Sequence, residues 1–304
     1  MRLFVTGASG WIGSAVVTEL LANGHQVLGL ARSDASAERI AAAGAEVRPG
    51  DITDLDVLAA AAAETDGVVH IAFRQDIAFS GDFEAAVASD HAAIQTIGTA
   101  LAQTGKPFAI ASGLAGLRAG RIATEADRPE PTPGAGGRVT NERTLLALAQ
   151  RGVRAMSIRF APTVHGTGDH GFIALIAAAD REHGAAAYVA DGANRWAAVH
   201  VTDAARLVRL GVEGAPAGSV LHAVGEEGVA LRQIAEALGH RLALPVRSIS
   251  HEEAADHFGF LAHFVAMDAP ASSAFTRELL GWAPAGPGLI ADLESGAYDP
   301  LAVA

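Results

Sequence analysis

Three glycines near the N-terminus have the spacing of a loop that binds phosphate groups. They lie in the run Thr6-Gly7-Ala8-Ser9-Gly10-Trp11-Ile12-Gly13, directly after the apolar segment Leu3–Thr6. Glycines at these positions permit a tight turn, a close approach of the backbone to a pyrophosphate, and close packing of a helix on a strand. The N-terminus of that helix adds N–H groups and a positive dipole. We therefore predict a dinucleotide-binding loop, whose cofactor contacts are Gly7, Ser9, Gly10, Trp11, Ile12 and Gly13.

The residues after the second apolar segment indicate which dinucleotide is bound. An acidic residue there hydrogen-bonds the ribose 2′-hydroxyl of NAD, whereas an arginine accommodates the 2′-phosphate of NADP. Ala31 occupies the position of the acid, and Arg32 and Ser33 follow it. The sequence therefore predicts that NADP(H) is preferred over NAD(H). The alternative is that Arg32 is an ordinary solvated loop residue.

Asp51 and Ile52 follow the third apolar segment, where they would meet the adenine ring. The stretch Asp51–Asp54 also has the composition of an ordinary helix N-cap. Both interpretations stay open on the sequence alone.

The segments that would position these residues alternate between short apolar runs and longer, alanine-rich stretches. This alternation is typical of a parallel sheet whose strands are joined by crossover helices. The predicted strands are Leu3–Thr6, Gln26–Ala31, Glu46–Arg48, Gly67–Ala72, Phe108–Ser112 and Arg154–Phe160. The predicted helices are Ile12–Ala22, Ser36–Ala43, Leu55–Ala63, Phe83–Gln103 and Arg138–Gln150. The fold class is α/β, a Rossmann-type doubly wound parallel sheet with a smaller C-terminal substrate-binding part.

The second half of the chain has a less regular pattern. It predicts helices at Gly171–Ala179 and Leu231–Leu238 and strands at Ala187–Ala190 and Ala197–Val201. We expect residues 1–165 to form the NAD(P)-binding domain, with a returning segment near residues 188–210. Residues 166–304 then form the smaller substrate-binding region.

Composition excludes several other classes of protein. The 304 residues contain no cysteine, which excludes thiolate nucleophiles and cysteine-bound metals. A formal charge of −12, from 34 acidic and 22 basic residues, argues against nucleic-acid binding. There is no targeting segment and no apolar run of about 18 residues, so we expect a cytoplasmic protein without a membrane span. We expect no metal site, because His251, His257 and His263 recur every six residues and do not share a helical face.

These features resemble the extended short-chain dehydrogenase/reductase family, whose signature is Thr-Gly-x-x-Gly-x-x-Gly. Val69–Ala72 looks like the strand that lines the cofactor, which implies that Ile71, Ala72 and Phe73 contact it. Phe108–Ser112 looks like the strand that carries the catalytic serine. Arg159–Gly166 is similar to the segment beside the nicotinamide, implying contacts from Phe160, Pro162 and Val164. Arg195–Asp203 resembles the segment around the substrate pocket.

The Tyr-x-x-x-Lys pair of that family is missing here. The tyrosines are Tyr188 and Tyr298, and the single lysine is Lys106, so no pair has the required spacing. Aligning Glu142 with the family's helix glutamate places Arg138 at the lysine and Gly134 at the tyrosine. The resemblance implies that Arg138 binds the ribose hydroxyls, although it is equally well a surface residue. Arginine is a poor proton shuttle because it stays protonated.

Ser112 is the candidate for orienting a carbonyl, but a strict alignment puts Gly113 at the serine position. His165 and Tyr188 are candidates to replace the missing proton donor, since an imidazole supplies a proton near neutral pH. The catalytic candidates are therefore Ser112, Arg138, His165 and Tyr188. The expected wall of the substrate pocket consists of His165, Tyr188, Arg195, Trp196 and His200. A packing role is an open alternative for each of these residues.

We expect an NADPH-dependent oxidoreductase that reduces a small organic carbonyl or imine by hydride transfer. A protonated imine would tolerate the missing tyrosine, because no alkoxide develops. The alternative from another class is a non-catalytic NADP(H)-binding sensor or scaffold. An epimerase or dehydratase with bound NAD is disfavoured by Arg32 and the missing tyrosine. A homodimer through Phe83–Gln103 and Arg138–Gln150 is also expected.

Overall fold

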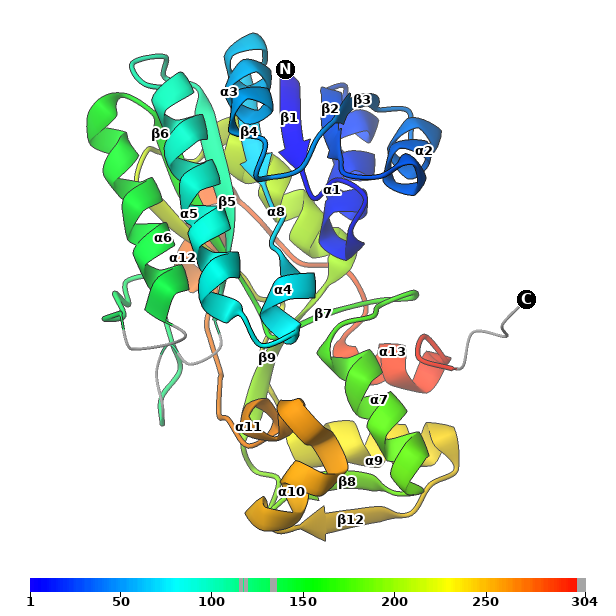
Figure 1. Cartoon of the computed structure of the whole chain (residues 1–304). Coiled ribbons are helices and arrows are strands. Elements are labelled where there is room, and N and C mark those ends of the chain that lie inside the picture. The colour runs from blue at the N-terminus through cyan, green and yellow to red at the C-terminus, as the bar shows by residue number, and fades with distance from the viewer. Residues whose placement is uncertain (115–116, 118–119, 132–135, 300–304) are drawn as a thin grey trace.

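Seven parallel strands form the central sheet of the molecule (Figure 1). The computed structural model describes residues 1–114, 117, 120–131 and 136–299. Within them the strand order is β10-β6-β5-β4-β1-β2-β3, which confirms the predicted doubly wound parallel sheet. The strands are β1 (Arg2–Thr6), β2 (Gln26–Ala31), β3 (Glu46–Pro49), β4 (Gly67–His70), β5 (Pro107–Gly113), β6 (Arg154–Phe160) and β10 (Ser219–Ala223).

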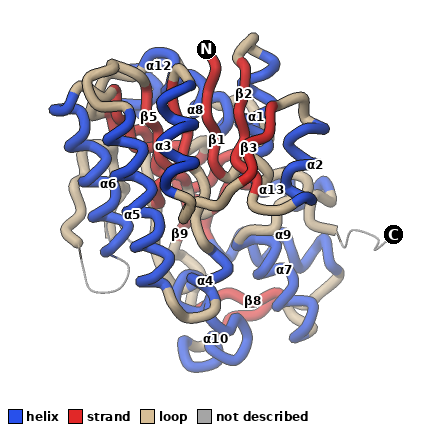
Figure 2. Tube along the Cα trace, turned by 45° about the horizontal axis from the view of Figure 1, so that its top comes forward, coloured by secondary structure: helices blue, strands red, loops and turns tan. Residues whose placement is uncertain are grey.

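Helices cover both faces of this sheet (Figure 2). One layer consists of α1 (Trp11–Ala22), α2 (Asp34–Ala42) and α8 (Val201–Gly214). The other consists of α3 (Leu55–Glu64), α5 (Phe83–Ala100) and α6 (Gly136–Ala147), which is followed by the 3-10 turn η1 (Leu148–Arg151). Leu3 and Val5 face the first layer and Phe4 faces the second. Burial of both faces explains why Leu3, Phe4 and Val5 of β1 are all apolar rather than alternating with polar residues.

Two central elements were not predicted from the sequence. The strand β10 adds a seventh strand beside β6, and α8 packs on α1. The buried residues of α8 include Ala204, Leu207, Val208 and Gly211, which share one face at helical spacing. The predicted strand at 197–201 is correspondingly β9 (Arg195–His200), because the helix begins at Val201.

A smaller body lies below the parallel sheet in Figure 1. It contains a three-stranded sheet of order β11-β9-β7 and a two-stranded sheet of β12 and β8. The strands are β7 (Thr163–His165), β8 (Ala186–Val189), β11 (Glu226–Ala230) and β12 (Val246–Ile249). The helical elements of this half are α7 (Phe172–His183), α9 (Leu231–Leu242), α10 (His251–Phe258), η2 (Gly259–Leu261), α11 (Ala262–Val265) and α13 (Leu289–Ser295). The predicted domain boundary at residue 165 stays a prediction.

Two short helices complete the fold. The helix α4 (Gln75–Phe79) follows β4 and precedes α5, and α12 (Ala274–Leu280) packs on α8 and β10. Within the described ranges, no helix combines the length and the apolarity that crossing a membrane requires.

Candidate functional site

The glycine loop lies at the carboxyl end of β1. The chain continues from β1 to β2 and β3 on one side of β1 and then crosses to β4 on its other side, so the strand order reverses at β1. Ligands of doubly wound sheets bind in the crevice at this switch point. Gly7 has a φ of +70°, and a Cβ there would lie 2.8 Å from the backbone nitrogen of Ala72. A Cβ at Gly13 would lie 1.9 Å from the carbonyl oxygen of Gly7. The loop therefore packs too closely for any other residue at either position.

The N-terminus of α1 is open to an anion. Gly10 is the N-cap residue, and among the described residues no side chain caps the helix. The first-turn N–H groups of Trp11, Ile12 and Gly13 therefore point out of the helix end, as a pyrophosphate site requires. The indole Nε1 of Trp11 donates to the carbonyl oxygen of Val164 at 2.8 Å, which ties this loop to β7.

The residues predicted for the adenosine end lie at the carboxyl ends of β2 and β3. The side chain of Arg32 is 57% exposed, and the hydroxyl of Ser33 accepts from the backbone N–H of Ser36 as the cap of α2. Asp51 accepts from the backbone N–H and the hydroxyl of Thr53, so its carboxylate closes a turn. Ile52 is buried in the core. The structure thus leaves Arg32 as the exposed group, and Ser33, Asp51 and Ile52 also have local structural roles.

Ser112 and Arg138 come together at the carboxyl end of β5. The Nη2 of Arg138 donates to the carbonyl oxygen of Ala111 at 2.8 Å, and its guanidinium lies 4.3 Å from the centre of the Phe73 ring. Phe160 pairs in register with Gly113 on the neighbouring strand, and half-buried Pro162 follows. Ile71 and Ala72 are half-buried in the loop after β4, since β4 ends at His70. The predicted cofactor contacts thus line one edge of the sheet, and Gly134 lies outside the described residues.

The side chain of Arg138 is 25% exposed and is anchored on the main chain of β5, and its role in binding the ribose stays a prediction. Its Nη1 lies 3.8 Å from Asp90, whose carboxylate also bonds His70 at 3.0 Å and Asn141 at 2.7 Å. Burial lowers the pKa of Arg138, and the charges of Asp90 and Glu142 oppose that shift. Burial also acts to raise the pKa of Asp90, but the hydrogen bond from His70 and the charge of Arg138 bring it below its usual range. A cation is thus held beside the end of β5.

The hydroxyl of Ser112 is tied into a buried ion pair. It donates to Oε2 of Glu142 at 2.9 Å. The same carboxylate accepts from Arg159 through Nε at 3.0 and 3.1 Å and through Nη2 at 2.6 Å. Arg159 is 0% exposed. A Cβ at Gly113, the position that aligns with the family's serine, would meet no atom of the described residues within 4 Å.

His165 lies in the core between β7 and α13. Its Nδ1 is 2.6 Å from Asp292 of α13, and its Nε2 is 4.0 Å from Glu226. His200 joins the cluster, with its Nε2 3.8 Å from Asp292. Burial lowers the pKa of His165, although the hydrogen bond to Asp292 opposes that shift. His165 and His200 therefore lie together beside Asp292.

The other predicted pocket residues lie elsewhere in the smaller body. Trp196 is 1% exposed, and its Nε1 donates to the carbonyl oxygen of Met267. Arg195 bonds Asp268 at 3.1 Å. Tyr188 lies on β8, where the guanidinium of Arg232 is 5.5 Å from its ring. Trp196 packs in a core, and the pocket wall formed by the five residues stays a prediction.

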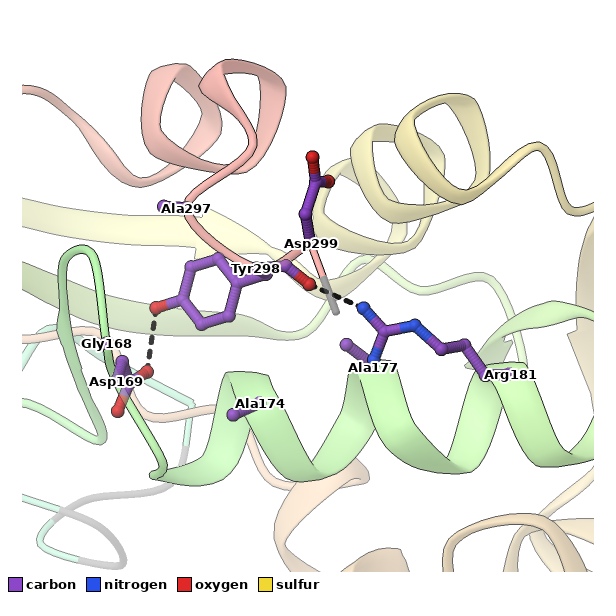
Figure 3. Close-up of a pocket in the computed structure, with 8 residues that line it drawn as sticks. All are labelled: Gly168, Asp169, Ala174, Ala177, Arg181, Ala297, Tyr298 and Asp299. Carbon is purple, nitrogen blue, oxygen red and sulfur yellow. Dashed lines mark hydrogen bonds between the residues drawn. The ribbon is translucent and has the colours of Figure 1, made fainter. Parts of the chain in front are cut away.

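A cavity of about 190 Å³ lies between α7 and the last described residues (Figure 3). Tyr298 donates its hydroxyl to Asp169 at 2.7 Å, and Arg181 donates to the carbonyl oxygen of Tyr298. Burial raises the pKa of Asp169. None of the cavity's lining residues was predicted from the sequence: Gly168, Asp169, Ala174, Ala177, Arg181, Ala297, Tyr298 and Asp299.

Four charged residues near the site were not predicted from the sequence. Asp90 lies beside Arg138, Asp292 bonds His165, and Arg74 bonds Asp76 in the loop after β4. Asp292 meets His165 across 127 positions of sequence, which no local signal reveals. Arg74 and Asp76 directly follow the strand that resembles the cofactor-lining one, and that position was the available signal.

Two curated relatives match the chain almost end to end. The uncharacterized protein C2A9.02 of Schizosaccharomyces pombe is 44% identical over 300 residues, which is 98% of this chain and 100% of the relative. The uncharacterized protein YLL056C of Saccharomyces cerevisiae is 40% identical over 297 residues, 97% of this chain and 98% of the relative.

Solved structures share the fold at lower identity. The dTDP-glucose 4,6-dehydratase DesIV of Streptomyces venezuelae, solved with NAD, has a TM-score of 0.78 at 23% identity, covering 98% of this chain and 96% of that one. The UDP-glucose 4-epimerase of Thermotoga maritima has a TM-score of 0.77 at 20% identity, covering 98% of both chains. The model of the NAD dependent epimerase/dehydratase family matches residues 3–220. The chain therefore belongs to this family, whose members are nicotinamide-dependent enzymes of the extended short-chain dehydrogenase/reductase type.

Proposed function

We propose that the protein is an NADPH-dependent reductase of a small organic carbonyl or imine. The observation that carries the proposal is the exposed guanidinium of Arg32 at the carboxyl end of β2. An NAD-specific site needs a carboxylate at this place, and Ala31 supplies none. The tight loop from Gly7 to Gly13 and the open N-terminus of α1 fit a pyrophosphate.

The residues at the end of β5 take the remaining roles in this proposal. Arg138 holds the ribose hydroxyls, and the cofactor supplies the hydride when bound. Ser112 gives its own hydrogen to Glu142, since a carboxylate only accepts, so the Ser112 oxygen is left as an acceptor. An acceptor at this point suits the N–H of a protonated imine better than a carbonyl that needs a proton. This favours an imine within the proposed substrate class.

The cofactor assignment is tested by titrating NADPH and NADH into wild type and Arg32→Ala. We expect wild type to prefer NADPH, and Arg32→Ala to lose about tenfold or more in NADPH affinity, because charge-assisted hydrogen bonds to the 2′-phosphate are removed. Arg39→Ala is the matched control, because Arg39 is an exposed arginine on α2, the helix that follows Arg32. Equal affinities of wild type for the two cofactors would remove the NADPH assignment.

The reaction is tested by following NADPH absorbance with a panel of ketones, aldehydes and cyclic imines. Turnover establishes a reductase, and faster turnover of imines supports the role of Ser112 as an acceptor. The second candidate is a sensor that binds NADPH without consuming it, favoured by Gly113, which carries no side chain where the family's serine would stand. NADPH binding without turnover across the panel supports that candidate. Co-purified NAD would instead indicate an epimerase or dehydratase.

A further inference from the structure

Four charged side chains meet at the expected adenosine end of the site. Arg32 follows β2, Asp51 follows β3, and Arg74 and Asp76 follow β4. Arg74 bonds Asp76 through Nε at 3.1 and 3.3 Å and through Nη2 at 3.1 Å. Its Nη1 lies 3.6 Å from Asp51. The carboxylate of Asp76 is therefore held at this edge by Arg74.

The same carboxylate also pairs with Arg32. Oδ2 of Asp76 is 3.5 Å from Nη1 of Arg32. The two side chains are 57% and 44% exposed, so the pair lies in water and exchanges partners at little cost. The Asp76 carboxylate is thus paired with the Arg32 guanidinium, which is the group expected to bind the 2′-phosphate of NADPH.

On the basis of the cofactor site proposed above, we propose that Asp76 competes with the 2′-phosphate for Arg32 and thereby sets the ratio of NADPH to NADH affinity. A bound 2′-phosphate carries up to two negative charges and would stand close to the Asp76 carboxylate. NADH has a hydroxyl at this place, which a carboxylate accepts from without repulsion. Arg32 therefore favours NADPH, and Asp76 opposes it.

The competition operates at neutral pH. The hydrogen bond from Arg74 lowers the pKa of Asp76 below its usual range, and the charge of Arg32 acts in the same direction. Asp76 is thus ionised at neutral pH.

The decisive variant is Asp76→Asn, which keeps the shape of the side chain and removes its charge. We expect NADPH affinity to rise about three- to tenfold, because a like charge near the phosphate is lost, and NADH affinity to stay unchanged or fall. Isothermal titration calorimetry measures the dissociation constants of NADPH and NADH for wild type and for each variant. In 0.5 M NaCl the gain should shrink, since exposed charges are screened there to a length of roughly 4 Å.

The matched control is Asp56→Asn. Asp56 is an exposed carboxylate in the first turn of α3, and among the described contacts it pairs with neither Arg32 nor Arg74. It removes the same net charge, so an equal gain in both variants would overturn the proposal. A ratio of NADPH affinity to NADH affinity that is the same in Asp76→Asn as in wild type would also overturn the proposal. Asp76→Ser gives a second measurement if the asparagine variant unfolds at a lower temperature than wild type.

The outcome is separable from the fate of the proposed function. If wild type prefers NADH but Asp76→Asn shifts the ratio toward NADPH, the cofactor assignment fails and the role of Asp76 stands. If wild type prefers NADPH and the ratio does not move, the cofactor assignment stands and the role of Asp76 fails.

Discussion

Glu142 lies beside the predicted cofactor site, and its carboxylate is also part of a buried ion pair. Its carboxylate is 6% exposed and neutralises Arg159, which is 0% exposed, while it also accepts from Ser112. A buried cation that loses its partner keeps its full desolvation cost. The orientation of Ser112 is therefore coupled to a pair on which the stability of the sheet depends.

Replacing Glu142 by alanine should lower the free energy of unfolding by about 3 to 5 kcal/mol, because Arg159 is left as an uncompensated buried charge. Glu130→Ala is the matched control, since Glu130 pairs with Arg143 at 2.9 Å but is 83% exposed. Its expected loss is below about 1 kcal/mol. Urea denaturation measures both, and similar losses would contradict the distinction between the two pairs.

At the scale of elements, α7, α10 and β8 enclose a second buried pair. Asp180 is 0% exposed; its Oδ1 lies 2.9 Å from Nε2 of His257 and accepts from the backbone N–H of Ala187. Burial raises the pKa of Asp180 to about 7. Burial likewise lowers the pKa of His257 to about 4, and His183 stacked on it adds to the shift. These shifts leave both groups neutral between about pH 4 and pH 7.

Asp180→Asn should gain stability relative to wild type as the pH rises from 5 to 8. The raised folded-state pKa of Asp180 means that its stabilising contribution is present at low pH and is lost as the pH rises through about 7. The difference in free energy of unfolding between Asp180→Asn and wild type should grow by at least about 1 kcal/mol over this range. Denaturation at several pH values measures it. Asp256→Asn, at an exposed carboxylate on α10, should show no such trend.

At the scale of the whole molecule, the C-terminal segment holds the loop through which the smaller body contacts Trp11 of the glycine loop. Asp292 reaches His165, and Tyr298 reaches Asp169, in the loop between β7 and α7. This loop also packs on Trp11, since a Cβ at Gly168 would lie 3.7 Å from the indole. The predicted homodimer involves the opposite side of the sheet, where α5 and α6 expose polar residues such as Gln95 and Arg143, and it stays a prediction.

Tyr298→Phe should cost about 1 to 3 kcal/mol of stability, because the half-buried carboxyl of Asp169 loses a hydrogen bond. It should also weaken NADPH binding about twofold or more by loosening the loop against Trp11. Tyr188→Phe is the matched control at the other tyrosine, and we expect it to leave both the stability and the NADPH affinity unchanged. Thermal unfolding and cofactor titration test both effects, and equal behaviour of the two variants would contradict the connection.

The sequence by itself determined the features that depend on neighbouring residues. The glycine spacing, the alternation of apolar strands with helices, and Arg32 in place of an acid all act within one turn or one strand. They sufficed for the parallel sheet and for the position of the glycine loop. The loss of the Tyr-x-x-x-Lys pair was equally certain, because it follows from counting residues.

Tertiary structure alone decided which distant side chains meet. Arg138 meets Asp90 of α5 and Phe73 after β4, and His165 meets Asp292 of α13 and, through the pairing of β7 with β9, His200. The strand β10 and the helix α8 join the sheet through packing on β6 and α1. Such contacts are selected by burial and charge compensation across the fold, and local spacing carries no record of them.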